Sequence, residues 1–233
     1  MHIGILQTGH APAELIPSLG DYDTMFHKLL EGQGFDFSTW SVVDMEFPNS
    51  VHAADGWLIT GSRHGVYEDH MFLDPLIQFI QAAFAAEVPM VGICFGHQAI
   101  AKAMGGTVEK FEKGWCVGRQ GYQMAGEEII MNAWHQDQVT VKPALATRIA
   151  SNGFCENAGL LYGKRALSLQ PHPEFDDTML EGLITYRGSA LPEDRLRYVK
   201  SQLGQRNDNR RIAATIADFF KSAHADTTQA VAS

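Results

Sequence analysis

Residues 89–104 are the most informative stretch of the sequence, PMVGICFGHQAIAKAM, where an apolar run meets a cysteine between two glycines and a helical pattern follows. Residues 89–93 predict a buried strand and residues 98–104 predict a helix. A nucleophile at such a strand-to-helix turn has a strained backbone, and the flanking glycines leave room for the turn. The helix N-terminus would also favour the thiolate of Cys94 over the thiol. Taken alone, the motif fits a structural cysteine in a glycine-rich turn equally well.

Outward from this stretch, strand-like and helix-like segments alternate through the N-terminal half. This alternation predicts βαβ units, and therefore a mostly parallel α/β sheet covered by helices on both faces. Residues 106–169 have short β-like runs, many glycines and little helical periodicity, which predicts an added antiparallel β segment. The other strands are expected at residues 2–7, 35–43 and 56–60, and helices at 22–31, 72–86 and from 176 onward, most clearly 212–220.

The length and composition favour one large domain. The chain has 233 residues, 45% of them hydrophobic, which is enough for a substantial core. Two small domains would fit the length equally well. We expect a single domain over residues 1–223. Residues 224–233 are mostly small or polar, and we expect them to form a disordered tail.

The charge and the cysteines argue against several classes of protein. The formal net charge is −9, with acidic residues spread along the chain, which argues against a nucleic-acid or anionic-membrane surface. Three widely spaced cysteines fit free thiols in a reducing compartment. Residues 1–6 look like a first strand rather than a signal peptide, and no apolar run approaches the roughly 20 residues that span a bilayer. We therefore expect a cytoplasmic protein without membrane or nucleic-acid partners.

A second segment, QPHPE at residues 170–174, supplies what a cysteine nucleophile requires. Two prolines hold the chain extended, so that His172 and Glu174 project to the same side. A histidine can take the thiol proton, and a carboxylate beside it fixes the tautomer and orientation of the ring. Taken alone, His172 is better explained as an ordinary loop histidine, as most histidines are.

The two segments together resemble the class I glutamine amidotransferases, from the N-terminal strand to about residue 175. The resemblance implies a flavodoxin-like fold and a triad in which Cys94 attacks a γ-glutamyl carbonyl to form a thioester. His172 would be the acid and base, and Glu174 would orient it. It implies a small-molecule substrate, glutamine or a γ-glutamyl compound, and no cofactor or metal.

The resemblance also places an oxyanion hole built from backbone N–H groups. One donor would be Phe95, directly after the nucleophile. The other would come from the loop at residues 60–67, at Gly61 and Ser62. This loop departs from the family pattern, because Ser62 replaces a second glycine and no proline follows it. A backbone donor survives a change of side chain, so we expect the hole to persist.

Two further residues match family positions near the substrate. Gln98 matches a glutamine beside the pocket, and His135 lies in the segment WHQDQV, which resembles the family pattern Ser-His-x-Asp-x-Val. For His135, a loop histidine beside a capping aspartate is an equally good interpretation. Trp115 and Cys116 stand where many relatives have a charged pair. We expect Cys116 to pack as a small hydrophobic residue and substrate recognition to differ from the family norm.

Other candidate signals are weak. His64 and His70 lie near Glu68 and Asp69, but the spacing is irregular, so we expect solvated loop residues rather than a metal site. The segment His10–Leu19, with two prolines, is expected to form a loop near the mouth of the pocket.

Residues 6–9 and 20–22 and the Gly61-Ser62 pair resemble the stand-alone, GMP synthase-like branch of the family. The chain ends soon after the triad and has no Walker-type phosphate loop, so we expect no synthetase domain. The leading hypothesis is a stand-alone hydrolase. Alternatives are a glutaminase subunit that supplies ammonia to a separate synthetase, and a non-catalytic binding protein on the same fold. A PfpI-like protease fits poorly, because there a histidine directly follows the cysteine and Phe95 stands here.

Overall fold

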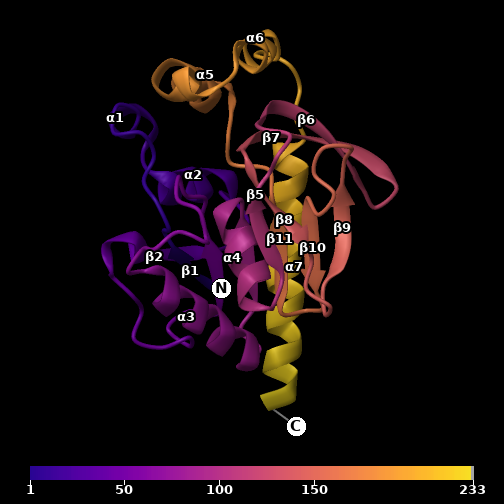
Figure 1. The fold of residues 1–233 in the computed structure, drawn as a ribbon. Coiled ribbons are helices and arrows are strands. Elements are labelled where there is room, and N and C mark those ends of the chain that lie inside the picture. Colours follow the sequence, from indigo (N-terminus) through magenta and orange to yellow (C-terminus); the bar gives the residue numbers. More distant parts are fainter. Residues whose placement is uncertain (232–233) are drawn as a thin grey trace.

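The computed structural model describes residues 1–231, of which 226–231 are described only as part of a helix (Figure 1). Its main sheet has nine described strands in the order β2-β1-β3-β4-β11-β10-β9-β6-β7. The first five pair in parallel, and the remaining four continue the sheet with antiparallel pairs. The predicted fold class, a flavodoxin-like α/β sheet flanked by helices with an added antiparallel segment, is confirmed.

The strands of this sheet are β1 (His2–Leu6), β2 (Asp36–Trp40), β3 (Gly56–Ile59), β4 (Met90–Ile93), β6 (Cys116–Met124), β7 (Glu127–His135), β9 (Thr147–Ser151), β10 (Gly159–Tyr162) and β11 (Ala166–Leu169). A second small sheet pairs β5 (Thr107–Lys110) with β8 (Asp137–Val141). The helices are α1 (Ile16–Leu19), α2 (Tyr22–Leu29), α3 (Leu73–Ala85), α4 (Phe95–Ala103), α5 (Asp177–Arg187), α6 (Glu193–Ser201) and α7 (Asn209–Val231). None of these described helices combines the length and apolarity needed to cross a membrane.

Some element boundaries differ from the sequence prediction. The helix expected from residue 98 begins at Phe95, because Cys94 itself makes the turn with a positive φ of 52°. The strand expected over residues 35–43 ends at Trp40, since a 3₁₀ turn at Val42–Asp44 bends the chain across the end of β1. Helix α7 includes residues 224–231 of the expected tail, and residues 232 and 233 lie outside the described residues.

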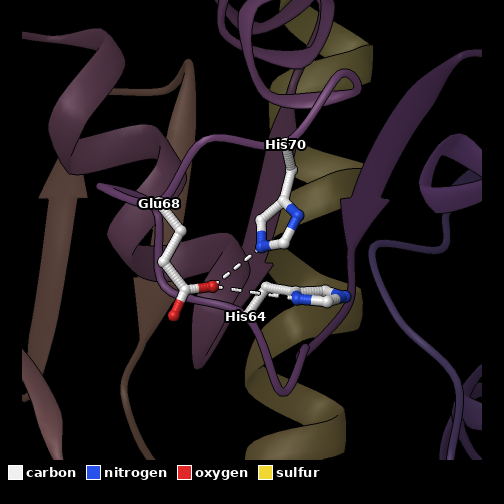
Figure 2. A group of neighbouring side chains, drawn as sticks. All are labelled: His64, Glu68 and His70. Atoms are coloured by element: carbon white, nitrogen blue, oxygen red, sulfur yellow. Dashed lines mark hydrogen bonds and ion pairs between the residues drawn. The ribbon is translucent and has the colours of Figure 1, made fainter.

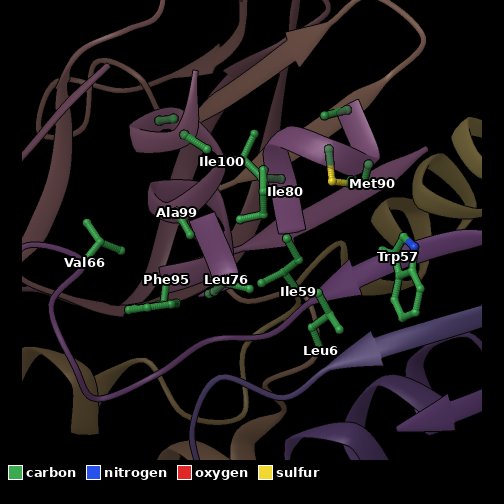
Figure 3. Close-up of a cluster of buried hydrophobic side chains, with 14 of the residues drawn as sticks. Leu6, Trp57, Ile59, Val66, Leu76, Ile80, Met90, Phe95, Ala99 and Ile100 are labelled. Carbon is green, nitrogen blue, oxygen red and sulfur yellow. The ribbon is translucent and has the colours of Figure 1, made fainter. Parts of the chain in front are cut away.

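Alternate residues of the central strands face opposite helical layers. On one face, Trp57 and Ile59 of β3 pack with side chains of α3 and α4 (Figure 3). On the other face, Leu58 of the same strand packs with Ile3 and Ile5 of β1, beneath α2 and α7. Both faces of the parallel strands are therefore buried. Their carboxyl ends remain available for a site, as is usual in open α/β sheets.

Candidate active site

Cys94 lies in a sharp turn between β4 and α4. Its backbone has φ 52° and ψ −102°, a conformation that costs a residue other than glycine about 1–3 kcal/mol. Hydrogen bonds hold the turn on both sides: the Cys94 N–H donates to the carbonyl of Leu169 at 2.8 Å, and the Gln98 N–H donates to the carbonyl of Cys94 at 3.1 Å. The side chain is therefore placed at the end of the sheet by a backbone that cannot relax freely.

The two flanking glycines are required by close backbone contacts. A Cβ atom at Gly92 would lie 2.5 Å from the carbonyl oxygen of Gly96, and one at Gly96 would lie 2.3 Å from the carbonyl oxygen of Ile59. Real Cβ atoms essentially never come this close. The glycine spacing in the sequence thus reflects the packing of the turn against β3.

His172 and Glu174 form a buried pair beside this turn. The Nδ1 atom of His172 lies 2.7 Å from Oε1 of Glu174, and the two side chains are 4% and 0% exposed. The His172 N–H donates to the carbonyl of Asn132 at 2.8 Å, which fixes His172 to β7. The chain was expected to be extended here, but it turns after His172, and the Phe175 N–H donates to the His172 carbonyl at 3.3 Å. The ring also stacks on Phe175, with 3.9 Å between centroids and 4° between planes. The imidazole is therefore fixed by the backbone, the carboxylate and an aromatic neighbour.

The protonation of His172 follows from its neighbours. Burial disfavours the imidazolium, but the charges of Glu174 and Cys94, together with hydrogen bonds to both side chains, prevail and raise the pKa of His172 to about 10. Because Nδ1 faces Glu174, Nε2 is the nitrogen available to Cys94. The arrangement therefore favours a protonated His172 ring between Cys94 and Glu174.

Two backbone N–H groups are candidate donors to an oxyanion. The carbonyl of Gly61 is within hydrogen-bonding distance of the hydroxyls of Thr8 (3.1 Å) and Thr60 (3.0 Å). A trans peptide directs the next N–H, that of Ser62, the opposite way. Phe95 is the first residue of α4, so its N–H has no acceptor within the helix. A Cβ atom at Gly61 would lie 2.9 Å from Cε1 of the His172 ring and 3.7 Å from Cβ of Cys94, which places this loop beside the pair.

A cavity of about 760 Å³ opens at the carboxyl ends of the parallel strands. Cys94, His172 and Ser62 line it, and residues 10–13 of the expected mouth loop line it too. Its other walls combine aromatic, aliphatic, basic and acidic side chains from distant parts of the chain, the acidic ones being Asp44, Glu68 and Asp137. They include Ile16, Tyr22, Arg63, Lys110, Trp115, Trp134, Phe175, Leu183 and Arg187.

Gln98 and His135 also line the cavity, but both are engaged with the protein. The Gln98 side-chain nitrogen donates to the carbonyl of Asp137 at 3.0 Å and to Oε1 of Gln170 at 3.1 Å. Burial and the nearby charge of His172 lower the pKa of His135 to about 3, so its ring is neutral. Its Nδ1 lies 3.1 Å from the Asp137 carbonyl and donates to it, which leaves Nε2 as a buried acceptor without a partner among the described residues.

Sequence reasoning missed several residues of the site. Phe175, which stacks on His172, directly follows the PHPE segment, and that adjacency was the available signal. Arg63, Lys110 and Arg187 reach the cavity from separate elements, and no local pattern marks them. Cys116 is buried, and burial raises its pKa to about 12, in line with its expected role as a small hydrophobic residue.

The loop between β3 and α3 brings three of its polar side chains together. His64, Glu68 and His70, expected to be solvated loop residues, are partly exposed and have ligand atoms within 4.8 Å of one another (Figure 2). The irregular spacing of these residues in the sequence did not predict the group, because the loop folds back on itself between the two histidines.

Comparisons with known proteins agree with this architecture. The family model described as Glutamine amidotransferase class-I matches residues 23–186. A glutamine amidotransferase-like protein of Schizosaccharomyces pombe is 27% identical over 94% of this chain and 98% of its own length. Gamma-glutamyl peptidase 4 of Arabidopsis thaliana is 31% identical over 71% of this chain and 72% of its own length. A solved glutamine amidotransferase structure from Thermotoga maritima shares the fold, with a TM-score of 0.73 at 20% identity, covering 96% of this chain and 99% of that one. The matched family region contains both the cysteine turn and the histidine segment, and this chain belongs to the class I glutamine amidotransferase family.

Proposed function

We propose that the chain is a Cys-His-Glu amidohydrolase that cleaves a γ-glutamyl amide bond through a thioester on Cys94. The observation that carries the proposal is the buried pair of His172 and Glu174, 2.7 Å apart, beside a cysteine held at a strained strand-to-helix turn. A nucleophile, a base and a group that orients the base are the parts that covalent amide hydrolysis requires.

Each step has a residue to perform it. The Cys94 thiolate attacks the γ-carbonyl carbon, and the N–H groups of Ser62 and Phe95 stabilise the oxyanion that forms. The His172 imidazolium then gives its proton to the leaving nitrogen, the C–N bond breaks, and a thioester remains. Neutral His172 next takes a proton from water, which attacks the thioester and releases the γ-carboxylate and the free thiolate. Glu174 stabilises the imidazolium whenever it forms.

The size and lining of the cavity favour a γ-glutamyl compound over free glutamine. About 760 Å³ falls within the roughly 300–1,000 Å³ of pockets that hold drug-sized ligands, which are much larger than one amino acid. Trp115 and Trp134 offer apolar surface to a leaving group, and Arg187 offers a partner for a carboxylate. A γ-glutamyl peptide with an apolar second residue has both features. The relative named gamma-glutamyl peptidase 4 supports the same class of substrate.

The test measures glutamate release from L-glutamine and from γ-glutamyl dipeptides with small, aromatic and charged second residues. We expect release from the dipeptides, fastest with an apolar second residue, and its loss in Cys94→Ala. Cys155→Ala is the matched control, since it removes a buried thiol that does not line the cavity.

Release from glutamine alone would favour the alternative, a glutaminase that supplies a separate synthetase. Hydrolysis that persists in Cys94→Ala, or no hydrolysis of any compound, would contradict the proposal.

A further inference from the structure

The loop between β3 and α3 holds a compact group of three metal-ligating side chains (Figure 2). Oε2 of Glu68 lies between two imidazoles, 2.8 Å from Nε2 of His70 and 3.8 Å from Nδ1 of His64. The ring centroids of His64 and His70 are 4.1 Å apart. Among the described residues, this is the one group of three His, Cys, Asp or Glu side chains with ligand atoms this close together.

Hydrogen bonding within the loop accounts for only part of this arrangement. The contact between Glu68 and His70 has hydrogen-bond length, but 3.8 Å between Glu68 and His64 is too long for a hydrogen bond. Phe72 packs beside both rings, with centroid distances of 5.9 Å to His64 and 5.8 Å to His70. Phe72 is itself buried, so the rings rest on a fixed apolar support. Two imidazoles are thus held beside one carboxylate, which is within hydrogen-bonding distance of His70 but not of His64.

We propose that His64, Glu68 and His70 bind a divalent transition-metal ion of the Zn²⁺ type. Two histidines and one glutamate form a recognised set of three protein ligands for zinc, with a fourth position left to water or another ligand. Metal–ligand bonds of about 2.0–2.2 Å require tetrahedral ligand atoms to lie on the order of 3.3 Å apart. Oε2 of Glu68 is closer than that to Nε2 of His70, at 2.8 Å, and farther than that from Nδ1 of His64, at 3.8 Å. All three side chains are partly exposed, so small rotamer adjustments can bring them to it.

The position of the group gives metal binding a structural consequence. His64 and Glu68 line the same cavity as Cys94, and the His64 N–H donates to the Ser62 hydroxyl at 3.2 Å. A metal on His64 would therefore immobilise the turn that contains the Ser62 backbone N–H. The metal site does not depend on the proposed hydrolase activity, and its test requires no turnover.

The test titrates Zn²⁺ into untagged full-length protein by competition with a chromophoric chelator. It is done in a Cys94→Ala background, because Cys94 and His172 could otherwise compete for the metal. Visible absorbance of Co²⁺ serves as a second probe of coordination by the same residues. The variants are His64→Ala, Glu68→Gln and His70→Gln, and His52→Ala is the control because it removes an exposed histidine elsewhere.

We expect one equivalent of Zn²⁺ to bind. Each of the three variants should weaken binding by at least about tenfold, since even residues that only support ligands have effects of that size. His52→Ala should leave affinity unchanged, and thermal unfolding without metal should match the parent in all four variants. No binding at micromolar Zn²⁺, or binding that all three variants leave intact, would overturn the proposal.

Discussion

Replacing Glu174 with glutamine should remove the negative charge of the proposed triad carboxylate while keeping the shape of the side chain. The glutamine carbonyl can still accept the hydrogen bond from Nδ1 of His172, so the ring keeps its tautomer and orientation. What is lost is the negative charge beside the imidazolium. The substitution therefore measures how much the charge itself contributes to the proposed reaction.

The expected loss follows from the geometry of the pair. With Nδ1 and Oε1 2.7 Å apart, the charge centres lie about 4 Å apart, where an effective dielectric constant of about 20 gives about 4 kcal/mol. At roughly 1.4 kcal/mol per factor of ten, kcat/KM should fall by about 10³-fold. Oε2 of Glu174 is buried and has no partner among the described residues, so a glutamine NH₂ group placed there should also cost about 1–3 kcal/mol of folding stability.

The assay compares glutamate release by wild type, Glu174→Gln and Glu193→Gln. Glu193 is exposed and paired with Arg197 on α6, so its substitution should change neither activity nor stability measurably. Alkylation of Cys94 as a function of pH provides a readout that a purely structural defect would not move. Without the negative charge of the carboxylate the His172 imidazolium is less stable. Half-maximal alkylation should therefore require a higher pH. A decrease of less than about tenfold in kcat/KM, with an unchanged alkylation profile, would refute this reasoning.

Three further predictions concern packing and protonation. Gly92→Ala should lower the free energy of unfolding in urea by roughly 1–3 kcal/mol, because its Cβ would meet the Gly96 carbonyl, whereas Gly153→Ala, with open space around it, should stay within about 0.5 kcal/mol. The pKa of His172 is raised from 6.5 to about 10, so its contribution to stability is complete below pH 6.5 and is lost as the pH rises toward 10. The Tm difference between wild type and His172→Gln should accordingly shrink over that interval. A Tm difference that stays constant would contradict the predicted loss of stability with rising pH. Burial raises the pKa of Cys116 to about 12, so mass spectrometry should find it unmodified by iodoacetamide in the native protein; early modification would contradict its buried placement.

The elements that sequence analysis located well are those whose signals are local. The strand, turn and helix around Cys94 occupy one continuous stretch, and the glycine spacing reports contacts made within and beside that turn. The PHPE segment likewise contains both members of the pair at 2.7 Å. In both cases a few adjacent residues form the local geometry, and the short spacing of His172 and Glu174 was enough to predict that their side chains project to the same side.

Arrangements made by distant segments could not be read in this way. Gln98 lines the cavity, and its amide nitrogen also donates to the Asp137 carbonyl, a contact across 39 positions that no local pattern indicates. Arg187 reaches the cavity from α5, whose placement depends on packing against α6 and against buried residues that include Leu15, Val117 and Phe175. The grouping of His64 and His70 depends on how a loop without regular structure folds. Hydrophobic periodicity in the sequence does not predict such contacts, because tertiary packing determines them.

Cys94 and His172 are far apart in the sequence, and the pairing of two strands brings them close together. Strands β4 and β11 are parallel neighbours with Ile93 opposite Leu169, so Cys94 and His172 both lie just beyond the carboxyl end of a strand. Neighbouring strands lie about 4.8 Å apart, which brings the two side chains within reach without any further adjustment. The β segment between these strands, residues 107–162, extends the sheet, and its Asn132 carbonyl accepts the hydrogen bond that holds the His172 backbone in place. A shift of one residue in the β4–β11 register would turn the histidine segment to the opposite face. The hydrogen bond from the Cys94 N–H to the Leu169 carbonyl locks that register at the point where the proposed chemistry depends on it.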